Sequence, residues 1–275
     1  MTVRLALRAV ALAAALWPCA APAAEPEFCT APPGWAAIIP PLDHLAAGIN
    51  LGALKLVAVG SSSTAGVGAT DPSMSYPSRL EAALRERFPA LDIHVINRGK
   101  GGEDAPEELA RLAADVVALH PDLVIWQIGT NAVLRRDDLA ADAEWMREGV
   151  ELLKKNGIDV VLMDMQYAPR VLDRPSYAVM QDMIAETADH AHVGLFRRFA
   201  LMRYWQRAHP TGAPAMIGGD GLHMTDAGYT CLALELAAAL EANWQAGEKI
   251  ARRSRGASDA IAWLPLLLPM EFPRD

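Results

Sequence analysis

The stretch that decides the fold is Leu54-Lys55-Leu56-Val57-Ala58-Val59-Gly60-Ser61-Ser62-Ser63-Thr64-Ala65-Gly66. It begins as a short apolar run with β-branched residues, which is typical of a buried strand, and it continues as a loop of glycine and hydroxyl residues. The other expected strands, all short apolar runs, are 93–97, 123–128, 160–165 and a weaker 193–196. The expected helices, which carry apolar residues at helical spacing, are 76–88, 106–119, 138–155, 175–191 and 225–246. This alternation predicts an α/β domain of three layers, with a five-stranded parallel sheet between two layers of helices.

The composition is that of an ordinary globular protein. The chain has 275 residues, of which 52% are hydrophobic, 21% charged and 6% aromatic, so it resembles neither a disordered nor a fibrous protein. Its 25 Lys and Arg against 33 Asp and Glu give a net charge of −8. Nucleic-acid binding usually needs clustered Lys and Arg in excess, so we expect no nucleic-acid partner.

The first residues have the pattern of a secretory signal peptide. Arg4 and Arg8 precede or enter an apolar run at 5–17, and the small residues Ala21-Pro22-Ala23 follow,. The run is shorter than the roughly 20 residues of a membrane-spanning helix, so we expect no transmembrane span. Cleavage near Ala23 would remove two arginines and no acidic residue, which changes the net charge from −8 to −10. We therefore expect a periplasmic or secreted protein.

The composition along the chain suggests four parts. Residues 1–23 form the signal peptide, 24–53 an N-terminal arm rich in Pro and Ala with one short helix near 43–47, 54–248 the α/β domain, and 249–275 a C-terminal tail. The tail begins with basic and polar residues and ends with an apolar run at 261–270 that is too short to span a membrane,.

Two cysteines remain after removal of the signal peptide, because Cys19 lies within it. Cys29 and Cys231 form an even pair in a compartment that permits disulfides,. They could form one intrachain disulfide between the arm and the last long helix, and two separate thiols are the alternative.

The loop after the first strand fits none of the common glycine-rich motifs. It lacks the Gly-Lys-Ser/Thr of a phosphate loop and the G-x-G-x-x-G that opens a helix in dinucleotide-binding folds,. It also lacks the G-x-S-x-G of a nucleophile elbow, because Thr64 stands where the last glycine would be,. Two interpretations stay open: a serine nucleophile at the start of a helix, or hydroxyl residues that cap that helix.

A second group of polar residues lies just before the last helix, where Asp220 and His223 are three residues apart. A serine needs a neutral imidazole to take its proton and a carboxylate to orient that imidazole, so this pair suits a serine hydrolase. A surface turn with an incidental histidine is the alternative. The other histidines show no compact spacing of metal ligands, so we expect no metal,.

Two further loops follow expected strands at the same sheet edge. One is rich in glycine, from Asn97 to Glu103, and the other is Gly129-Thr130-Asn131. Backbone N–H groups and an Asn amide can stabilise the oxyanion of acyl transfer, although each loop by itself could be a simple turn.

Together these four loops resemble the SGNH (GDSL) hydrolase family, whose blocks supply a Ser, a Gly, an Asn and a D-x-x-H in that order. The resemblance covers residues 54 to about 246 and implies a flavodoxin-like fold with 54–248 as the catalytic domain. Ser61 replaces the usual Asp before the nucleophile, and Ala132 replaces the Asp that usually follows the block Asn.

The resemblance also implies site residues. The catalytic residues would be Ser62, Asp220 and His223, and the oxyanion hole would be formed by Ser62, Gly102 and Asn131. Gly99 is the alternative glycine if the loop register differs. The implied activity is a cofactor-free serine esterase acting on acyl or acetyl esters of lipids, thioesters or O-acetylated glycans. A non-catalytic carbohydrate-binding or accessory protein on the same fold is the alternative.

Two segments have no assigned role. One contains four arginines and four aromatic residues within 196–207, and we interpret it as a solvated helix face with an aromatic core side, with contact to an anionic substrate as the alternative,. The other, Met163-Asp164-Met165-Gln166-Tyr167, leaves the fourth expected strand at the edge that carries the loops.

Overall fold

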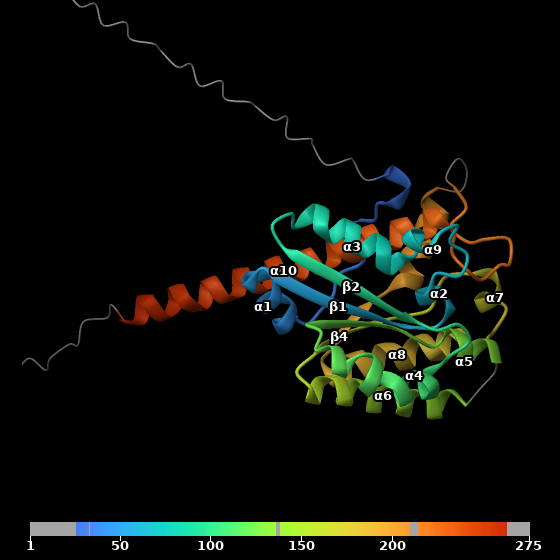
Figure 1. Cartoon of the computed structure of the whole chain (residues 1–275), viewed down its shortest axis with the longest axis horizontal. Helices are drawn as coiled ribbons and strands as arrows, with labels where there is room; N and C mark the ends of the chain where they lie inside the picture. The colour runs from blue at the N-terminus through green and yellow to red at the C-terminus, as the bar shows by residue number, and fades with distance from the viewer. Residues whose placement is uncertain (1–25, 33, 136–137, 210–213, 263–275) are drawn as a thin grey trace, which may run out of the picture.

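The structure, a computed structural model, describes residues 26–32, 34–135, 138–209 and 214–262. A five-stranded parallel sheet forms its centre, with helices on both faces (Figure 1). The strands are β1 (Ala53–Gly60), β2 (Asp92–Gly99), β3 (Leu123–Gln127), β4 (Asp159–Met163) and β5 (Gly194–Phe196). Their order is β2-β1-β3-β4-β5, which is the flavodoxin-like order,. The predicted fold class and all five predicted strands are confirmed.

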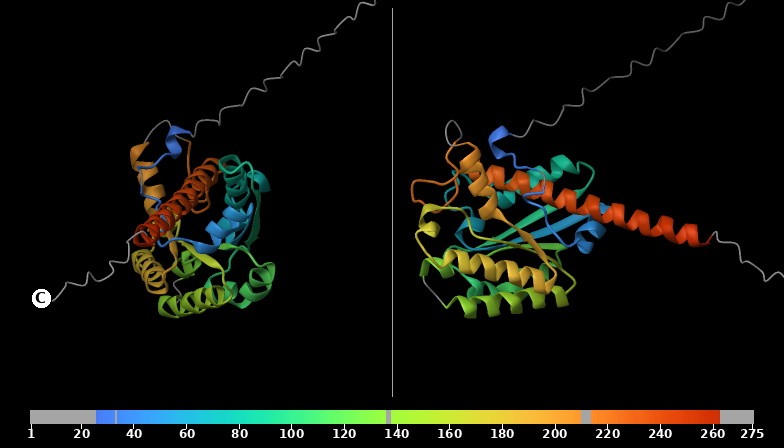
Figure 2. Two further views of the ribbon diagram at one scale, coloured as in Figure 1. Left: turned by 90° about the vertical axis from the view of Figure 1, so that its left-hand side faces the viewer. Right: turned by 180° about the vertical axis from the view of Figure 1, so that it is seen from behind.

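Helices of both layers run alongside the sheet. The long helices are α3 (Tyr76–Arg87), α4 (Ala105–Asp115), α6 (Leu139–Lys155), α8 (Tyr177–Ala191), α9 (Arg198–Ala208) and α10 (Asp226–Ala262). The shorter ones are η1 (Glu27–Cys29), α1 (Asp43–Leu51), α2 (Ser62–Ala65), η2 (Pro72–Met74), η3 (Val117–Leu119), α5 (Thr130–Arg135) and α7 (Pro169–Leu172). Helices α3 and α10 cover one face of the sheet, and α4, α6 and α8 cover the other (Figures 1 and 2).

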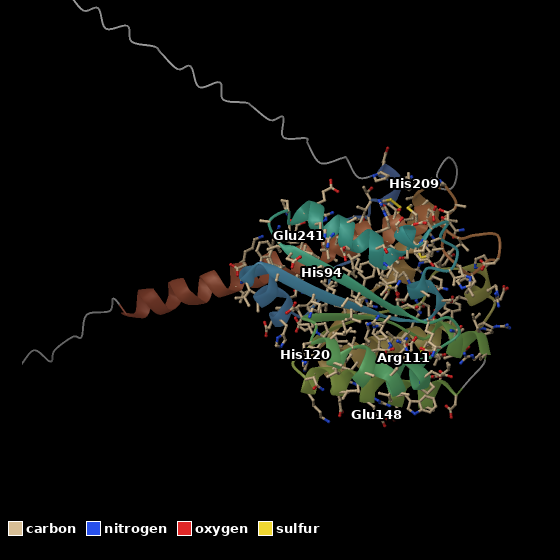
Figure 3. The ribbon with its side chains drawn as sticks, in the orientation of Figure 1. His94, Arg111, His120, Glu148, His209 and Glu241 are labelled. Carbon is tan, nitrogen blue, oxygen red and sulfur yellow. A yellow bond between two sulfur atoms is a disulfide. The ribbon has the colours of Figure 1, made fainter. Side chains whose placement is uncertain are left out.

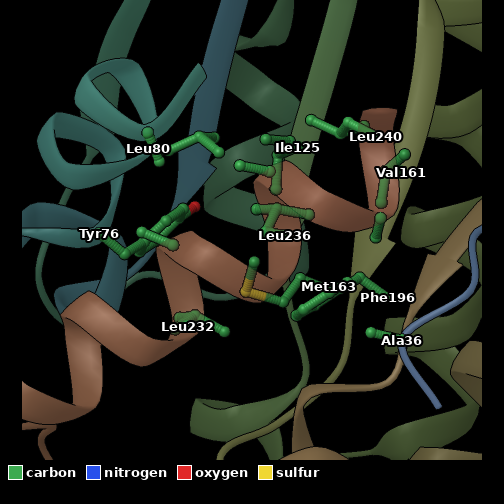
Figure 4. Packing of buried hydrophobic residues seen from close by; sticks show 14 of the residues in the cluster. Ala36, Tyr76, Leu80, Ile125, Val161, Met163, Phe196, Leu232, Leu236 and Leu240 are labelled. Atoms are coloured by element: carbon green, nitrogen blue, oxygen red, sulfur yellow. The ribbon is translucent and has the colours of Figure 1, made fainter. Parts of the chain in front are cut away.

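The alternation of side chains along β1 divides the core into two halves. Leu56 and Ala58 belong to the cluster under α3 and α10, whereas Val57 and Val59 belong to the cluster under α4, α6 and α8. All four side chains are fully buried. In the first cluster, leucines of α10 pack against side chains of β3 and β4 (Figure 4). A strand buried on both faces explains why the run at 56–59 is continuously apolar,.

The order of the strands creates a topological switch point at one edge of the sheet,. The chain passes from β1 to β2 on one side and then crosses to β3 on the other side of β1. The loops that follow β1 and β3 therefore diverge, and ligands of open α/β sheets bind at this kind of switch point.

The N-terminal arm is fastened to α10. A disulfide joins Cys29 of η1 to Cys231 of α10, across 202 positions of sequence. Further along α10, the Asn243 amide donates hydrogen bonds to the carbonyls of Ile38 and Pro40, both at 2.9 Å, and accepts one from the N–H of Leu42 at 3.0 Å. The arm thus closes over the face of the sheet that α10 covers.

Three elements differ from the sequence prediction. The expected strand at 160–165 ends at Met163, where Asp164 instead accepts the Phe199 N–H at 2.9 Å. The last helix continues beyond the expected end at residue 246 as far as Ala262, because the chain contains no proline in that range, and its end projects from the domain (Figure 2),. Helix α9, expected as a helix with an aromatic core side within 196–207, begins only at Arg198 because Phe196 ends β5; its buried Phe199 and Trp205 form the expected core side.

Residues 1–23, where a signal peptide is expected, and most of the apolar run at 261–270 lie outside the described residues. Within the described part of the chain, no helix combines the length and the apolar character needed to cross a bilayer.

Candidate active site

The loop after β1 presents Ser62 as the first residue of the short helix α2. Gly60 ends the strand with φ +153°, and a Cβ there would lie 2.4 Å from Thr64 Oγ1 and 2.8 Å from the Gln127 carbonyl oxygen, so only glycine fits. Residue Ser62 also places its backbone N–H among the first N–H groups of a helix, which have no partner within the helix.

The side chain of Gln127, the last residue of β3, holds this loop in place. Its Oε1 accepts hydrogen bonds from the Ser61 N–H at 3.1 Å, the Ser61 hydroxyl at 3.2 Å and the Thr64 hydroxyl at 3.2 Å. Gln127 is 1% exposed. Sequence analysis did not identify this residue, although it is the one polar residue in the apolar run of β3. The contact also gives Ser61, which replaces the family's Asp, a defined partner.

Ser62, His223 and Asp220 form a continuous chain of hydrogen bonds. Ser62 Oγ lies 2.8 Å from His223 Nε2, and His223 Nδ1 lies 2.5 Å from Asp220 Oδ2. The other carboxylate oxygen of Asp220 accepts the backbone N–H groups of Leu222 and His223, both at 3.0 Å. The arrangement therefore links a hydroxyl, an imidazole and a carboxylate in the order that proton transfer from the hydroxyl requires.

The electrostatics of this chain favour an ionised Asp220. Burial opposes its ionisation, but the hydrogen bonds from His223 and from two backbone N–H groups outweigh burial and bring the pKa of Asp220 down to about 2,. The His223 side chain is only 15% exposed, whereas that of Asp220 is 45% exposed. A carboxylate that is charged at neutral pH can hold the imidazole and stabilise it when it becomes positively charged.

The loop that carries Asp220 and His223 is fixed by its backbone. The Gly218 N–H donates to the His223 carbonyl at 2.8 Å, and the Arg170 N–H donates to the Gly221 carbonyl at 3.0 Å. Gly68 packs against the loop so closely that a Cβ there would lie 2.5 Å from the Met224 carbonyl oxygen. These contacts place the end of the loop beside the start of α2.

The glycines of the second loop have different surroundings. Gly99 donates its N–H to Asn97 Oδ1 at 2.8 Å, and a Cβ on Gly99 would lie 2.1 Å from the Ala65 nitrogen. Gly102 has φ +83° and stands third in a four-residue turn closed by a hydrogen bond from the Glu103 N–H to the Lys100 carbonyl. A positive φ at this position is what a type II turn requires. Gly99 is therefore needed for close packing against α2, with its N–H already bonded, and Gly102 for the turn.

Asn131, on α5, lies against the second loop. Its Nδ2 donates to the Glu103 carbonyl at 2.7 Å, which leaves the second N–H of the amide for another acceptor,. The Arg135 guanidinium donates to the Gly102 carbonyl. The second loop also lies close to Ser62, because a Cβ added to Gly101 would be 3.9 Å from the Cβ of Ser62. The second loop is thus in contact with both the first loop and the third.

Gln166 connects the third and fourth loops. Its Oε1 accepts hydrogen bonds from the Thr130 hydroxyl at 3.0 Å and from Arg198 Nη2 at 2.9 Å, and its Nε2 donates to the Leu222 carbonyl at 3.3 Å. The segment at 163–167, which had no assigned role, therefore contributes a buried brace. Ala132, which stands where the third block usually has an Asp, is fully buried.

Arg198 does not lie where the sequence interpretation placed the arginines of 196–207, on a solvated helix face. It is fully buried and donates from Nε to the Asp164 carbonyl at 2.9 Å. Arg203 and Arg207 of the same helix are exposed, as expected. Burial raises the pKa of Asp164 to about 7,. Hydrophobic spacing could not separate these arginines, because the burial of Arg198 depends on two acceptors in the segment after β4, the Asp164 carbonyl and Gln166 Oε1.

The described residues contain no group of three His, Cys, Asp or Glu side chains placed to hold a metal ion. The histidine beside Ser62 is instead bonded to a carboxylate and a hydroxyl.

Comparison with known proteins identifies the family of this chain. Residues 28–246 match the non-GDSL lipase-like family. An arylesterase from Vibrio mimicus is 30% identical over 169 residues, covering 62% of this chain and 79% of the relative. An acetylxylan esterase from Geobacillus stearothermophilus is 38% identical over 64 residues, covering 23% of this chain and 29% of the relative.

A solved structure shows the same fold. A two-domain esterase active on acetylated mannans superposes with a TM-score of 0.60 at 24% identity, covering 74% of this chain. The match spans 52% of that esterase, so this chain corresponds to about half of its length. The resemblance to SGNH hydrolases is confirmed by the family match, which includes all four loops. The chain is a carboxylic ester hydrolase, and it belongs to the non-GDSL lipase-like family.

Proposed function

We propose that this esterase uses Ser62 as nucleophile, His223 as general base and Asp220 as the carboxylate that orients the imidazole. The observation that carries the proposal is the hydrogen-bond chain through these three side chains, at 2.8 and 2.5 Å. With its proton on Nδ1 facing Asp220, His223 has Nε2 free to accept the proton of the Ser62 hydroxyl.

The reaction then proceeds through an acyl-enzyme. Ser62 Oγ attacks the ester carbonyl carbon as His223 takes the hydroxyl proton, and a tetrahedral intermediate forms. The intermediate collapses when the bond to the alcohol oxygen breaks and His223 returns the proton to that oxygen. Water, deprotonated by His223, attacks the acyl group, and the carboxylic acid leaves with Ser62 restored. No step requires a metal or an organic cofactor.

In the same proposal the oxyanion is held by the Ser62 N–H, the Gly102 N–H and the Asn131 side chain. Ser62 begins a helix, and Asn131 has one amide N–H beyond its bond to Glu103. Gly102 is favoured over Gly99 because the Gly99 N–H already donates to Asn97. Each preorganised donor contributes roughly 3–4 kcal/mol to the stability of such an intermediate.

We propose acetyl esters of carbohydrates as the substrate class. The acetylxylan esterase relative supports this choice by its name, and the arylesterase relative supports aryl esters as a second class that can use the same machinery. Lipid and thioester substrates receive no support from these relatives.

We also propose that the protein is exported after cleavage near Ala23. The support is the signal pattern at 1–23 and the Cys29–Cys231 disulfide, because disulfides persist in oxidising compartments such as the periplasm,. Mass spectrometry of the protein recovered from a bacterial periplasm would test this, and a chain that retains residue 1 would contradict it.

The triad is tested with a fluorophosphonate probe and p-nitrophenyl acetate. Wild type should be labelled on Ser62 and hydrolyse the ester, whereas Ser62→Ala should be folded, unlabelled and inactive. Ser63→Ala changes the adjacent serine and serves as the matched control, which should retain labelling. Ester hydrolysis by Ser62→Ala at a rate close to wild type would refute the assignment.

The substrate class is tested by comparing p-nitrophenyl esters of increasing acyl length, phenyl acetate and acetylated xylo-oligosaccharides. We expect kcat/KM to be highest for acetyl and to fall with acyl length, with acetate released from the oligosaccharides. A rise with chain length would overturn the proposal in favour of lipid-like substrates.

A further inference from the structure

A nearly buried ion pair lies behind the second loop. Glu103, at the end of the turn, and Arg111, on α4, are joined from Arg111 Nε to Glu103 Oε2 at 2.6 Å. Their side chains are only 9% and 13% exposed. Figure 3 labels Arg111 on α4, close to the strands. The pair is therefore unlike a solvated surface ion pair, which contributes little to structure.

Glu103 is attached to two of the proposed oxyanion donors. It follows Gly102 directly in the chain, and its carbonyl oxygen accepts the Asn131 amide at 2.7 Å. Its other carboxylate oxygen, Oε1, lies 2.9 Å from the Lys100 ammonium group at the start of the turn. A displacement of Glu103 would therefore move the Gly102 N–H and the Asn131 side chain together.

Arg111 reaches the nucleophile loop from the same place. Its Nη2 donates to the Gly60 carbonyl at 3.3 Å, two residues before Ser62, and that carbonyl also accepts the Lys100 N–H at 2.9 Å. The remaining nitrogen, Nη1, donates to Asp115 on α4 at 3.1 Å. One guanidinium thus joins the end of β1 to the side chain of Glu103.

We propose that Glu103 and Arg111 are a pair of positioning residues that hold the oxyanion donors in register with the nucleophile. The proposal rests on the catalytic roles given above to Ser62, Gly102 and Asn131. The pair touches neither substrate nor reacting atoms; it acts by fixing the distance between the first and second loops. Preorganised donors contribute to catalysis only when they are already in place, and a misplacement of about 1 Å can reduce the rate about 100-fold.

The geometry favours this role over one confined to folding. An isolated brace for α4 would need only the contact of Arg111 with Asp115, four residues away on the same helix. Arg111 instead directs two of its three nitrogens away from α4, toward Glu103 and Gly60. Breaking the pair should therefore affect stabilisation of the tetrahedral intermediate more than binding of the substrate.

The test compares Glu103→Gln and Arg111→Lys with wild type. Glu103→Gln keeps the length of the side chain and the carbonyl that binds Asn131, but removes the charge. Arg111→Lys keeps the charge, but one ammonium group cannot span the distances that the guanidinium covers. Asp115→Asn is the matched control, because it alters the third contact of Arg111 and leaves the contact with Glu103 unchanged.

The measurements are kcat and KM for p-nitrophenyl acetate, the inhibition constant of phenylboronic acid, the pH profile of kcat/KM and the melting temperature. Phenylboronic acid forms a tetrahedral adduct with an activated serine and places an oxygen where the oxyanion would be. For both variants we expect kcat to fall about 10- to 100-fold with KM within about threefold, and boronate affinity to fall in parallel with kcat/KM. The midpoint of the pH profile should not move, because the Asp220–His223 pair is untouched.

Three results would each overturn the inference. The first is wild-type kcat and boronate affinity in both folded variants. The second is a loss of kcat that Asp115→Asn reproduces, and the third is a loss of kcat without a parallel loss of boronate affinity. If a variant does not fold, the other decides, since each weakens the ion pair between Glu103 and Arg111. Failure of the proposed function would look different, because wild type itself would then escape labelling at Ser62.

Discussion

Gly99 provides a sharp test of how closely the second strand must approach the nucleophile helix. It ends β2, pairs with Gly60 of β1 and lies directly against α2. A Cβ on Gly99 would lie 2.1 Å from the Ala65 nitrogen and 2.4 Å from the Thr64 carbonyl carbon. Both are backbone atoms, so a rotamer change cannot relieve the overlap. We therefore predict that Gly99→Ala displaces either α2 or the turn that follows Gly99.

The size of the displacement follows from the contact distances. Ordinary contacts of a Cβ begin near 3.4 Å, so the Ala65 nitrogen must retreat by about 1.3 Å, the difference between 3.4 and 2.1 Å. Such a shift of α2 would stretch the 2.8 Å hydrogen bond between Ser62 Oγ and His223 Nε2 beyond bonding distance,. A misplacement of this size costs about 100-fold in rate. A shift of the turn would displace the Gly102 N–H instead, with an effect of similar size.

The assay is kcat/KM for p-nitrophenyl acetate together with the rate of fluorophosphonate labelling and the melting temperature. Gly101→Ala is the control, because its Cβ would have Ser62 Cβ at 3.9 Å as its near neighbour, which is an ordinary contact. We expect Gly99→Ala to lose about 100-fold in both rates while Gly101→Ala stays within a few-fold of wild type. A folded Gly99→Ala protein with activity within threefold of wild type would refute the reasoning.

Two further predictions concern stability. Cys29→Ala removes the disulfide to Cys231, which closes a loop of 202 positions; the chain-entropy model gives about 5 kcal/mol for such a loop, so the melting temperature should fall by roughly 10–20 °C,. Calorimetry checks this, with reduced wild type as control, and a fall of under 3 °C would contradict it. Glu108, whose pKa burial raises to about 8, accepts a hydrogen bond from Trp126 Nε1 at 2.6 Å. Between the unfolded pKa near 4.3 and this value the folded protein holds the extra proton, so stability falls as pH rises, by at most about 1.4 kcal/mol per unit. Glu108→Gln cannot titrate, so wild type should lose more melting temperature than this variant from pH 5 to pH 8; equal losses would argue against the raised pKa.

The fold could be predicted from the sequence because its signals are local. Parallel strands buried on both faces are continuously apolar, and the helices between them repeat apolar residues at helical spacing, as at 56–59 and 138–155,. The predictions that failed lie where such signals are weak. In α9 the arginines were assigned to a solvated face, although Arg198 is buried, and α10 extends past residue 246 through a stretch in which polar and charged residues outnumber large apolar ones.

The candidate site was partly predictable for a different reason. Ser62, Gly102, Asn131 and the pair Asp220 and His223 lie in four short blocks whose order and spacing resemble a known family, and each block follows a strand or precedes a helix. Their catalytic roles remain predictions that the experiments above address. The supporting residues left no such pattern, since Gln127 is a single polar residue at the end of an apolar run and Gln166 lies in a segment, 163–167, to which the sequence assigned no role.

The sequence by itself determined the alternation of strands and helices and the four loops at one sheet edge. It left open whether the two remaining cysteines form a disulfide. Only the tertiary structure decided that the disulfide forms, that the Gly99 N–H is already bonded, and that Glu103 and Arg111 join the first two loops. The physical reason is the range of the interactions. Hydrophobic periodicity is written within one element, whereas these contacts join side chains and backbone groups of different elements, and their partners depend on where each loop turns.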